Sequence, residues 1–371
     1  MKKYLSLFAL AIGMFGSRPF AQISGTESLQ QTASIPPGYY DATTGLTCAS
    51  LKTALFNIIS SNTTELVYTP GVWNAFYTTD LKRNDANTAD VIWDIYSDNP
   101  TGPEAFYFSP GNDQCGTYSQ QGDCYNREHS FPQAWFGSGA YPMFSDLHHV
   151  FPTDGFSNAK HDNNPYSEVG NTSWTSVNGS KLGNNSFPGF SGTVFEPINE
   201  YKGDIARAML YMVTRYQDKM VSWKNNANAD DILNGTAYPS LDDWYIRLCY
   251  KWHVQDPPSA KEIARNNAIY ALQGNRNPFV DRPDFVEQIW RCTGLLATTY
   301  TFTGNGNWTN AANWANGSIP PSPLASGNAI VIDPAPGGQC ILNTTQRISA
   351  GARITINSGK SFLIPGQLQI Q

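Results

Sequence analysis

The sequence predicts a mixed α+β domain over residues 22–297, followed by a small all-β module over residues 298–371. Apolar residues recur at helical spacing after residue 199, and short β-branched and aromatic runs precede them. From about residue 295 charged residues nearly disappear and Gly, Asn, Thr and Ile dominate, which indicates short strands joined by turns. A chain of 371 residues is also longer than one ordinary domain needs.

The first 21 residues predict a secretory signal peptide. Lys2 and Lys3 supply the charged start, residues 4–15 are uncharged and largely apolar, and Ala21 ends a segment that resembles a cleavage site. The apolar run has 12 residues, whereas a membrane-spanning helix needs about 20. No later segment is long and apolar enough to span a membrane. We therefore expect a secreted protein, extracellular or periplasmic, without membrane insertion.

The first half of the domain combines one helix with short strands. Leu51, Leu55 and Ile58 share one helical face, and Thr47 or Ser50 is available as a cap. The composition of residues 91–96 and of residues 105–108 predicts two strands, and residues 111–126 are expected to form a loop.

The second half is mainly helical. Helices are expected from residue 199 to about residue 216, at 241–253, at 259–273 and after Pro283. Gly274 lies where a helix C-cap belongs. In the last module we expect a solenoid-like set of short strands, at residues 329–332, 346–348, 353–356 and 361–364. Two tryptophans there, Trp308 and Trp314, are either core residues or a contact surface for a glycan.

Six cysteines behind a signal peptide predict disulfides. The sequence contains no CxxC pair, which argues against a zinc ribbon. We expect Cys115 to pair with Cys124, because a loop rich in Gly and Gln separates them. The second pairing that we expect joins Cys249 to Cys292.

The net charge is unusual for a protein that binds a polyanion. The chain carries 24 basic and 30 acidic residues, net −6. Three basic residues lie in the signal and the last module contributes +2, so residues 22–297 hold about −11. Because the overall field is repulsive, binding to nucleic acid would need a local group of cations and a metal ion.

Candidate catalytic residues concentrate between residues 126 and 158. Four of the five histidines lie between residues 129 and 161. Hydrolysis of a phosphodiester needs a base for water, and imidazole is suited to that role near neutral pH. Carboxylate and amide oxygens suit a hard cation such as Mg²⁺. The neighbours Glu128 and His129 would point in different directions, so that one can hold metal while the other faces water.

At these positions the chain resembles the bacterial endonuclease I family, which consists of secreted or periplasmic nucleases with a ββα-metal (His-Me finger) core. The resemblance spans roughly residues 35–293. It rests on five blocks in order, namely Arg127-Glu128-His129, Ser145-Asp146-Leu147-His148, Phe151-Pro152-Thr153-Asp154 with Asn158, the segment from Phe195 to Ala208, and Gln273 to Phe279.

The resemblance implies roles for particular residues. His129 is expected to be the general base. Glu128 and Asn158 are expected to hold one divalent cation, Mg²⁺, with Ca²⁺ or Mn²⁺ as substitutes. The expected reaction is hydrolysis of DNA, RNA or both with little sequence specificity, leaving 5′-phosphate ends. The resemblance thus predicts a ββα-metal core embedded in a mainly helical domain.

The phosphate-binding arginine of related branches has no counterpart here, because residues 130–157 contain no Arg or Lys. Arg127, Arg276 or Lys160 could replace it. His148 is expected to be a structural histidine, and His161 to be solvated or packed.

Several alternatives remain open at this stage. The protein could be a ribonuclease with little action on DNA, or a catalytically dead nuclease-like protein that binds through its last module to a surface or glycan. Zinc-dependent hydrolysis is disfavoured, because HExxH is absent. We expect a monomer.

Overall fold

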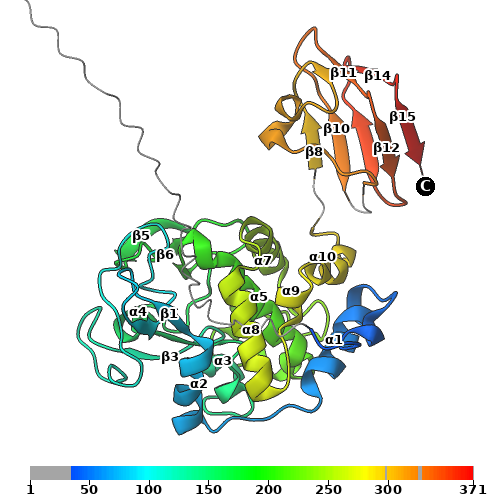
Figure 1. Ribbon diagram of the computed structural model, residues 1–371. Helices are drawn as coiled ribbons and strands as arrows, with labels where there is room; N and C mark the ends of the chain where they lie inside the picture. The colour runs from blue at the N-terminus through cyan, green and yellow to red at the C-terminus, as the bar shows by residue number, and fades with distance from the viewer. Residues whose placement is uncertain (1–34, 297–298, 325–327, 371) are drawn as a thin grey trace, which may run out of the picture. The chain divides into compact units, whose positions relative to one another are not determined.

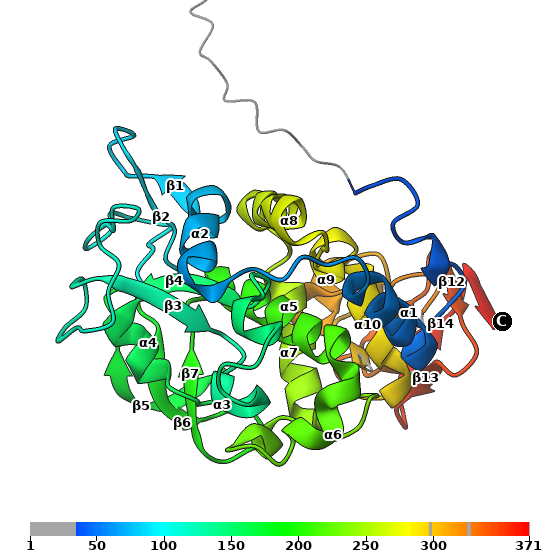
Figure 2. The same ribbon diagram turned by 90° about the horizontal axis from the view of Figure 1, so that it is seen from below.

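A computed structural model describes residues 35–296, 299–324 and 328–370 (Figures 1 and 2). The predicted signal peptide lies outside these ranges. Among the described residues, no helix has both the length and the apolar character needed to cross a membrane. The first part of the chain comprises residues 35–296, and the second comprises residues 299–324 and 328–370.

Helices surround α5 in the first part, and both views show α5 in the interior among them. Every residue of α5 from Tyr201 to Arg215 is buried. The helices are α1 (Cys48–Ser60), α2 (Trp73–Thr79), α3 (Gln133–Phe136), α4 (Gly155–His161), α5 (Asn199–Arg215), α6 (Met220–Trp223), α7 (Asp243–Gln255), α8 (Ala260–Gln273), α9 (Pro278–Asp281) and α10 (Asp284–Trp290).

Helical periodicity predicted α1, α5, α7, α8 and α10 correctly. The ends of α8 show the reason, because they are fixed by local chemistry. The Ser259 hydroxyl accepts a hydrogen bond from the backbone N–H of Glu262, and Gly274 ends the helix with φ 77°. Thr47 is at the N-cap position of α1, but its side chain makes no capping hydrogen bond.

Seven short strands form three antiparallel sheets in the first part, as far as it is described. They are β1 (Leu81–Arg83) with β2 (Asp90–Ile92), β3 (Tyr125–His129) with β4 (Val150–Asp154), and the sheet of β5 (Val169–Thr175), β6 (Lys181–Asn185) and β7 (Thr193–Glu196).

The predicted strand over residues 91–96 ends early, at Ile92. The cause is the side chain of Asp94, which accepts hydrogen bonds from the Tyr96 backbone N–H at 2.8 Å and the Ser97 hydroxyl at 2.6 Å. These local bonds turn the chain and replace a strand ladder. The strand predicted at residues 105–108 is also wrong, since that segment belongs to no strand.

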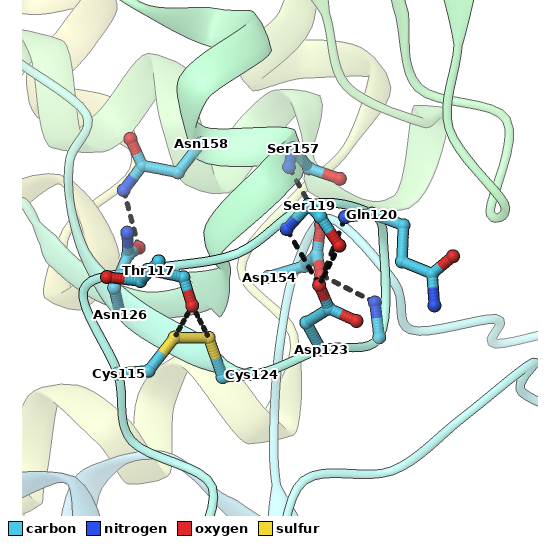
Figure 3. Close-up of a disulfide and its surroundings, with 11 residues drawn as sticks. Cys115, Thr117, Ser119, Gln120, Asp123, Cys124, Asn126, Asp154, Ser157 and Asn158 are labelled. Carbon is cyan, nitrogen blue, oxygen red and sulfur yellow. Dashed lines mark hydrogen bonds between the residues drawn. A yellow bond between two sulfur atoms is a disulfide. The ribbon is translucent and has the colours of Figure 1, made fainter.

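The element order β3–β4–α4 positions the site described below. β4 leads directly into α4, with Asp154 as the N-cap residue whose carboxylate accepts from the backbone N–H of Ser157 at 2.7 Å (Figure 3). The same carboxylate accepts from the Gly122 backbone N–H at 2.9 Å. The start of α4 is therefore fixed both to β4 and to the loop before β3.

Two disulfides are present in the described residues. Cys115–Cys124 confirms the first predicted pairing. The pairing of Cys249 with Cys292 is wrong, because Cys292 is bonded to Cys48 at the start of α1. Cys249 is a free thiol that is 1% exposed in the core around α7. Helical spacing faces Cys249 inward, and the start of α1 lies beside Cys292 only in the folded chain.

The second part contains eight described strands: β8 (Thr299–Phe302), β9 (Gly306–Asn307), β10 (Ala329–Ile332), β11 (Gln339–Ile341), β12 (Thr345–Ile348), β13 (Arg353–Ile356), β14 (Ser361–Leu363) and β15 (Gln367–Ile370). They pair in parallel, in the orders β13–β10–β8, β14–β11–β9 and β12–β15. The four strands predicted in this part are confirmed. Trp308 and Trp314 are core residues, 1% and 3% exposed.

Candidate active site

The site is built where β3 faces α4. Side chains two residues apart on a strand share a face, and those three apart on a helix share a face. Asn126 and Glu128 of β3 therefore face Asn158 and His161 of α4. The Asn158 amide Nδ2 donates to Asn126 Oδ1 at 2.8 Å, and His161 Nδ1 lies 2.6 Å from Glu128 Oε1. Figure 3 shows the asparagine pair.

An open pocket of about 350 Å³ lies at this place. It is lined by Tyr118, Arg127, Glu128, His129, Pro132, Gln133, Asn158, Ala159, Asp162 and Asn163. Four of the five predicted site residues thus meet in one pocket, and these four come from β3 and α4.

Glu128 presents its two carboxylate oxygens to different surroundings. Oε1 accepts hydrogen bonds from the hydroxyls of Tyr96 at 3.1 Å and Tyr166 at 3.2 Å, and it lies beside His161. The two tyrosine hydroxyls also contact each other. Oε2 has no hydrogen-bond partner within the described part of the chain. Since Glu128 lines the pocket although only 2% of it is exposed, Oε2 is the oxygen available to a ligand.

The imidazole of His129 is held in one tautomer. Its Nε2 lies 3.0 Å from the carbonyl oxygen of Phe144, which only accepts, so Nε2 carries the proton. Nδ1 then carries the lone pair, which accepts a hydrogen bond from the Gln133 amide Nε2 at 3.2 Å. Burial, and after it the neighbouring His149, lowers the pKa of His129 to about 3. The ring is therefore neutral near pH 7, and Nδ1 is its unprotonated nitrogen.

Arg127 is fixed at the wall of the pocket. Its Nη1 donates to the Tyr68 carbonyl at 2.8 Å and the Thr69 hydroxyl at 2.7 Å. The guanidinium carbon is 3.6 Å from the ring centroid of Tyr68 and 4.3 Å from that of Trp73. Its Nε and Nη2 have no hydrogen-bond partner in the ranges that the structure describes. A preorganised cation with free donors can bind a phosphate oxygen.

Arg276 does not join this group. It is 1% exposed, its Nε and Nη2 donate to the Asp281 carboxylate at 2.6 and 2.7 Å, and Nη2 also donates to Asn267. It does not line the pocket. The structure therefore does not bring Arg276 together with the other four predicted site residues, because a buried ion pair with Asp281 holds its guanidinium elsewhere.

His148 has the structural role predicted for it. It is buried, and its Nε2 lies 3.2 Å from the Asn275 carbonyl oxygen. Sequence reasoning missed the position of His161, although its spacing of three residues after Asn158 on a helix could have indicated it. It also missed Tyr96 and Tyr166, for which no local signal exists in the sequence.

The donors at the pocket suit a hard cation. No cluster of three or more His, Cys, Asp or Glu side chains in the described ranges could hold a metal ion. Mg²⁺ needs no such cluster, because it keeps several waters and takes one or two protein oxygens. Glu128 Oε2 is free, and Asn158 uses its NH₂ group on Asn126, which leaves its own Oδ1 as an acceptor. These two oxygens could hold such an ion.

Comparison of the sequence with known proteins shows its family. The sequence profile of endonuclease I matches residues 47–284. The chain belongs to the endonuclease I family. An extracellular ribonuclease of Bacillus amyloliquefaciens is 33% identical over 278 residues, 72% of this chain and 85% of the relative. An extracellular ribonuclease of Bacillus subtilis (strain 168) is 32% identical over 259 residues, 68% of this chain and 78% of the relative. This endonuclease I family member is a nuclease that hydrolyses phosphodiester bonds.

Proposed function

We propose that the protein is a secreted, metal-dependent endonuclease that cleaves RNA, and DNA as a second substrate, with little sequence preference. The observation that carries the proposal is the meeting of Glu128, His129 and Asn158 in one open pocket. The names of the two relatives support RNA as a substrate. Two disulfides and the extracellular relatives support secretion.

In the proposed reaction, His129 Nδ1 takes the proton of the attacking water. The Phe144 carbonyl keeps the opposite nitrogen protonated and thereby holds the ring in the tautomer that the step needs. Glu128 Oε2 and Asn158 Oδ1 are the proposed ligands of one divalent cation, Mg²⁺ or in its place Mn²⁺ or Ca²⁺. When bound, that cation neutralises charge on the phosphate and on the leaving 3′ oxygen. The products then carry 5′ phosphates.

Arg127 is the proposed phosphate-binding residue. Residues 22–297 carry about −11, so long-range attraction cannot hold the substrate. A guanidinium that is already held in contact with two rings loses little freedom when it binds a phosphate. We expect few phosphate contacts and therefore a shallow dependence of binding on salt.

The test is digestion of RNA and of plasmid DNA by one preparation of mature protein, with EDTA and across a series of divalent cations. His129→Ala should lower the rate by roughly 10²- to 10⁴-fold while the protein stays folded. His253→Gln is the control, because His253 is a buried histidine on α7 that makes a backbone contact. Cleavage in EDTA, or a wild-type rate in His129→Ala, would refute the mechanism.

The same experiment decides between substrates. Cleavage of RNA with intact plasmid would identify a ribonuclease, and absence of cleavage with every cation would favour a binding protein with a dead nuclease core. End-labelling before and after phosphatase treatment tests the 5′ phosphate.

A further inference from the structure

His161 is buried behind the pocket and not exposed in it. Its side chain is completely buried, and it is not one of the residues that line the pocket. It cannot contact a substrate in this conformation. Its Nδ1 lies 2.6 Å from Glu128 Oε1.

Packing alone does not explain a histidine at this position. The ring stacks on Tyr166 with centroids 4.3 Å apart and meets Phe195 edge-on at 5.4 Å. Neither ring nitrogen has an aligned hydrogen-bond partner among the described residues. A buried polar group left in this way costs about 1–3 kcal/mol. An aliphatic side chain would fill the same space without that cost.

The contact of His161 acts on one oxygen of Glu128. Tyr96, Tyr166 and His161 all meet Oε1, and none of them meets Oε2. A rotation of the carboxylate that exchanged its oxygens would break and have to remake all three contacts. The three partners together therefore fix the orientation of the carboxylate, with one oxygen toward them and the other free for the pocket.

We propose that His161 is a positioning residue that holds Glu128 Oε1, so that Oε2 is presented as the cation ligand. This inference rests on the proposed function. One helix then serves the site twice, because α4 carries both the ligand Asn158 and, three residues later, the residue that orients the second ligand. Partners that orient a metal ligand in this way commonly change metal affinity by about 10- to 100-fold when they are removed.

The test is binding of Mn²⁺ to the mature protein, followed by calorimetry and by the electron paramagnetic resonance of free Mn²⁺. In His161→Asn the amide nitrogen can take the place of Nδ1, whereas in His161→Gln it reaches the place of Nε2. We expect His161→Leu and His161→Gln to bind Mn²⁺ roughly 10- to 100-fold more weakly. His161→Asn should stay within about threefold of the wild type, because it keeps a polar nitrogen beside Oε1.

His253→Leu is the matched control. His253 is also buried, but it is on α7 and its Nε2 lies 3.0 Å from the backbone carbonyl oxygen of Pro283. It should lose stability without loss of Mn²⁺ affinity. For His161→Leu and His161→Gln, activity relative to wild type should be low at low cation concentration. At saturating cation their kcat should be closer to that of wild type.

The outcomes distinguish failure of the proposed function from failure of the role proposed for His161. If wild type binds no divalent cation, or Glu128→Gln binds it as tightly as wild type, the proposed function fails. If wild type binds and Glu128→Gln does not, but folded His161→Leu keeps the wild-type Kd, His161 has no positioning role. If His161→Leu does not fold, equal Kd values for His161→Asn and His161→Gln lead to the same rejection.

Discussion

Removal of the disulfide between Cys48 and Cys292 should destabilise the enzyme far more than removal of the one between Cys115 and Cys124. Their sequence separations are 244 and 9 residues. In the chain-entropy account a crosslink restricts the unfolded chain, and its effect grows with the logarithm of the loop length. For these two loops that account gives about 5.5 and about 2.7 kcal/mol.

The assay is urea unfolding of the two double serine variants, monitored by tryptophan fluorescence and far-ultraviolet circular dichroism. The variant at Cys48 and Cys292 should lose about 3 kcal/mol more than the variant at Cys115 and Cys124. Equal losses, or a larger loss for the short loop, would refute the reasoning from loop length.

The short disulfide has a second, local effect. The loop that it closes carries Tyr118, which lines the pocket, and Gln121, whose amide donates to the Ser157 hydroxyl of α4 at 3.0 Å. We therefore expect the variant at Cys115 and Cys124 to lose activity while it is still fully folded. Initial rates on RNA below the unfolding transition measure this.

Three further predictions concern the scaffold. Asp146→Ala should lower the free energy of unfolding by about 3–5 kcal/mol, because it leaves the buried Arg215 without its carboxylate partner. Asp218→Ala, which removes an exposed pair with Lys219, should lower it by less than about 1 kcal/mol, and urea unfolding compares the two variants. His253 has its pKa lowered by burial to about 4, so its unfolded form gains a proton before its folded form as pH falls through about 6.5. The stability of wild type relative to His253→Gln should therefore drop by about 2 kcal/mol between pH 7 and pH 5, and parallel curves would contradict this. In Gly155→Ala the new Cβ would lie 2.5 Å from a ring carbon of Tyr118, in the loop closed by the short disulfide. The free energy of unfolding should fall by about 1–3 kcal/mol, seen as a lower melting temperature, and the rate of RNA cleavage should fall as well.

The helices could be predicted because their signals are local. Apolar spacing, a capping serine and a glycine with positive φ lie within the residues of α8 itself. The strand over residues 91–96 could not, because its composition suits a strand while the Asp94 side chain turns the backbone. The partner of Cys292 could not be predicted either. It is 244 residues away, and pairing at that distance depends on the folded packing of α1.

In the candidate site, too, some residues could be predicted from local sequence and others could not. Residues 154–161 contain the N-cap Asp154, the amide of Asn158 and His161, in the spacing of two helical turns. Because β4 passes into α4 without a loop, the cap determines which residues face β3. The positions of Glu128 and Asn158 thus follow from short segments. The hydroxyls that act on Glu128 come from Tyr96 and Tyr166, 32 and 38 residues away, and no spacing rule joins them.

Few side chains of the site reach the pocket, and their positions are fixed mainly by neighbouring residues. Of the side chains that contact Glu128, His129 and Arg127, the largest share are rings: Tyr96, Tyr166, His161, Phe144, Tyr68 and Trp73. Rings have few rotatable bonds, so they fix a neighbour at a small cost in conformational entropy. A nuclease with a net negative charge needs this arrangement, because it cannot compensate for a loosely held arginine or carboxylate with general attraction for the substrate.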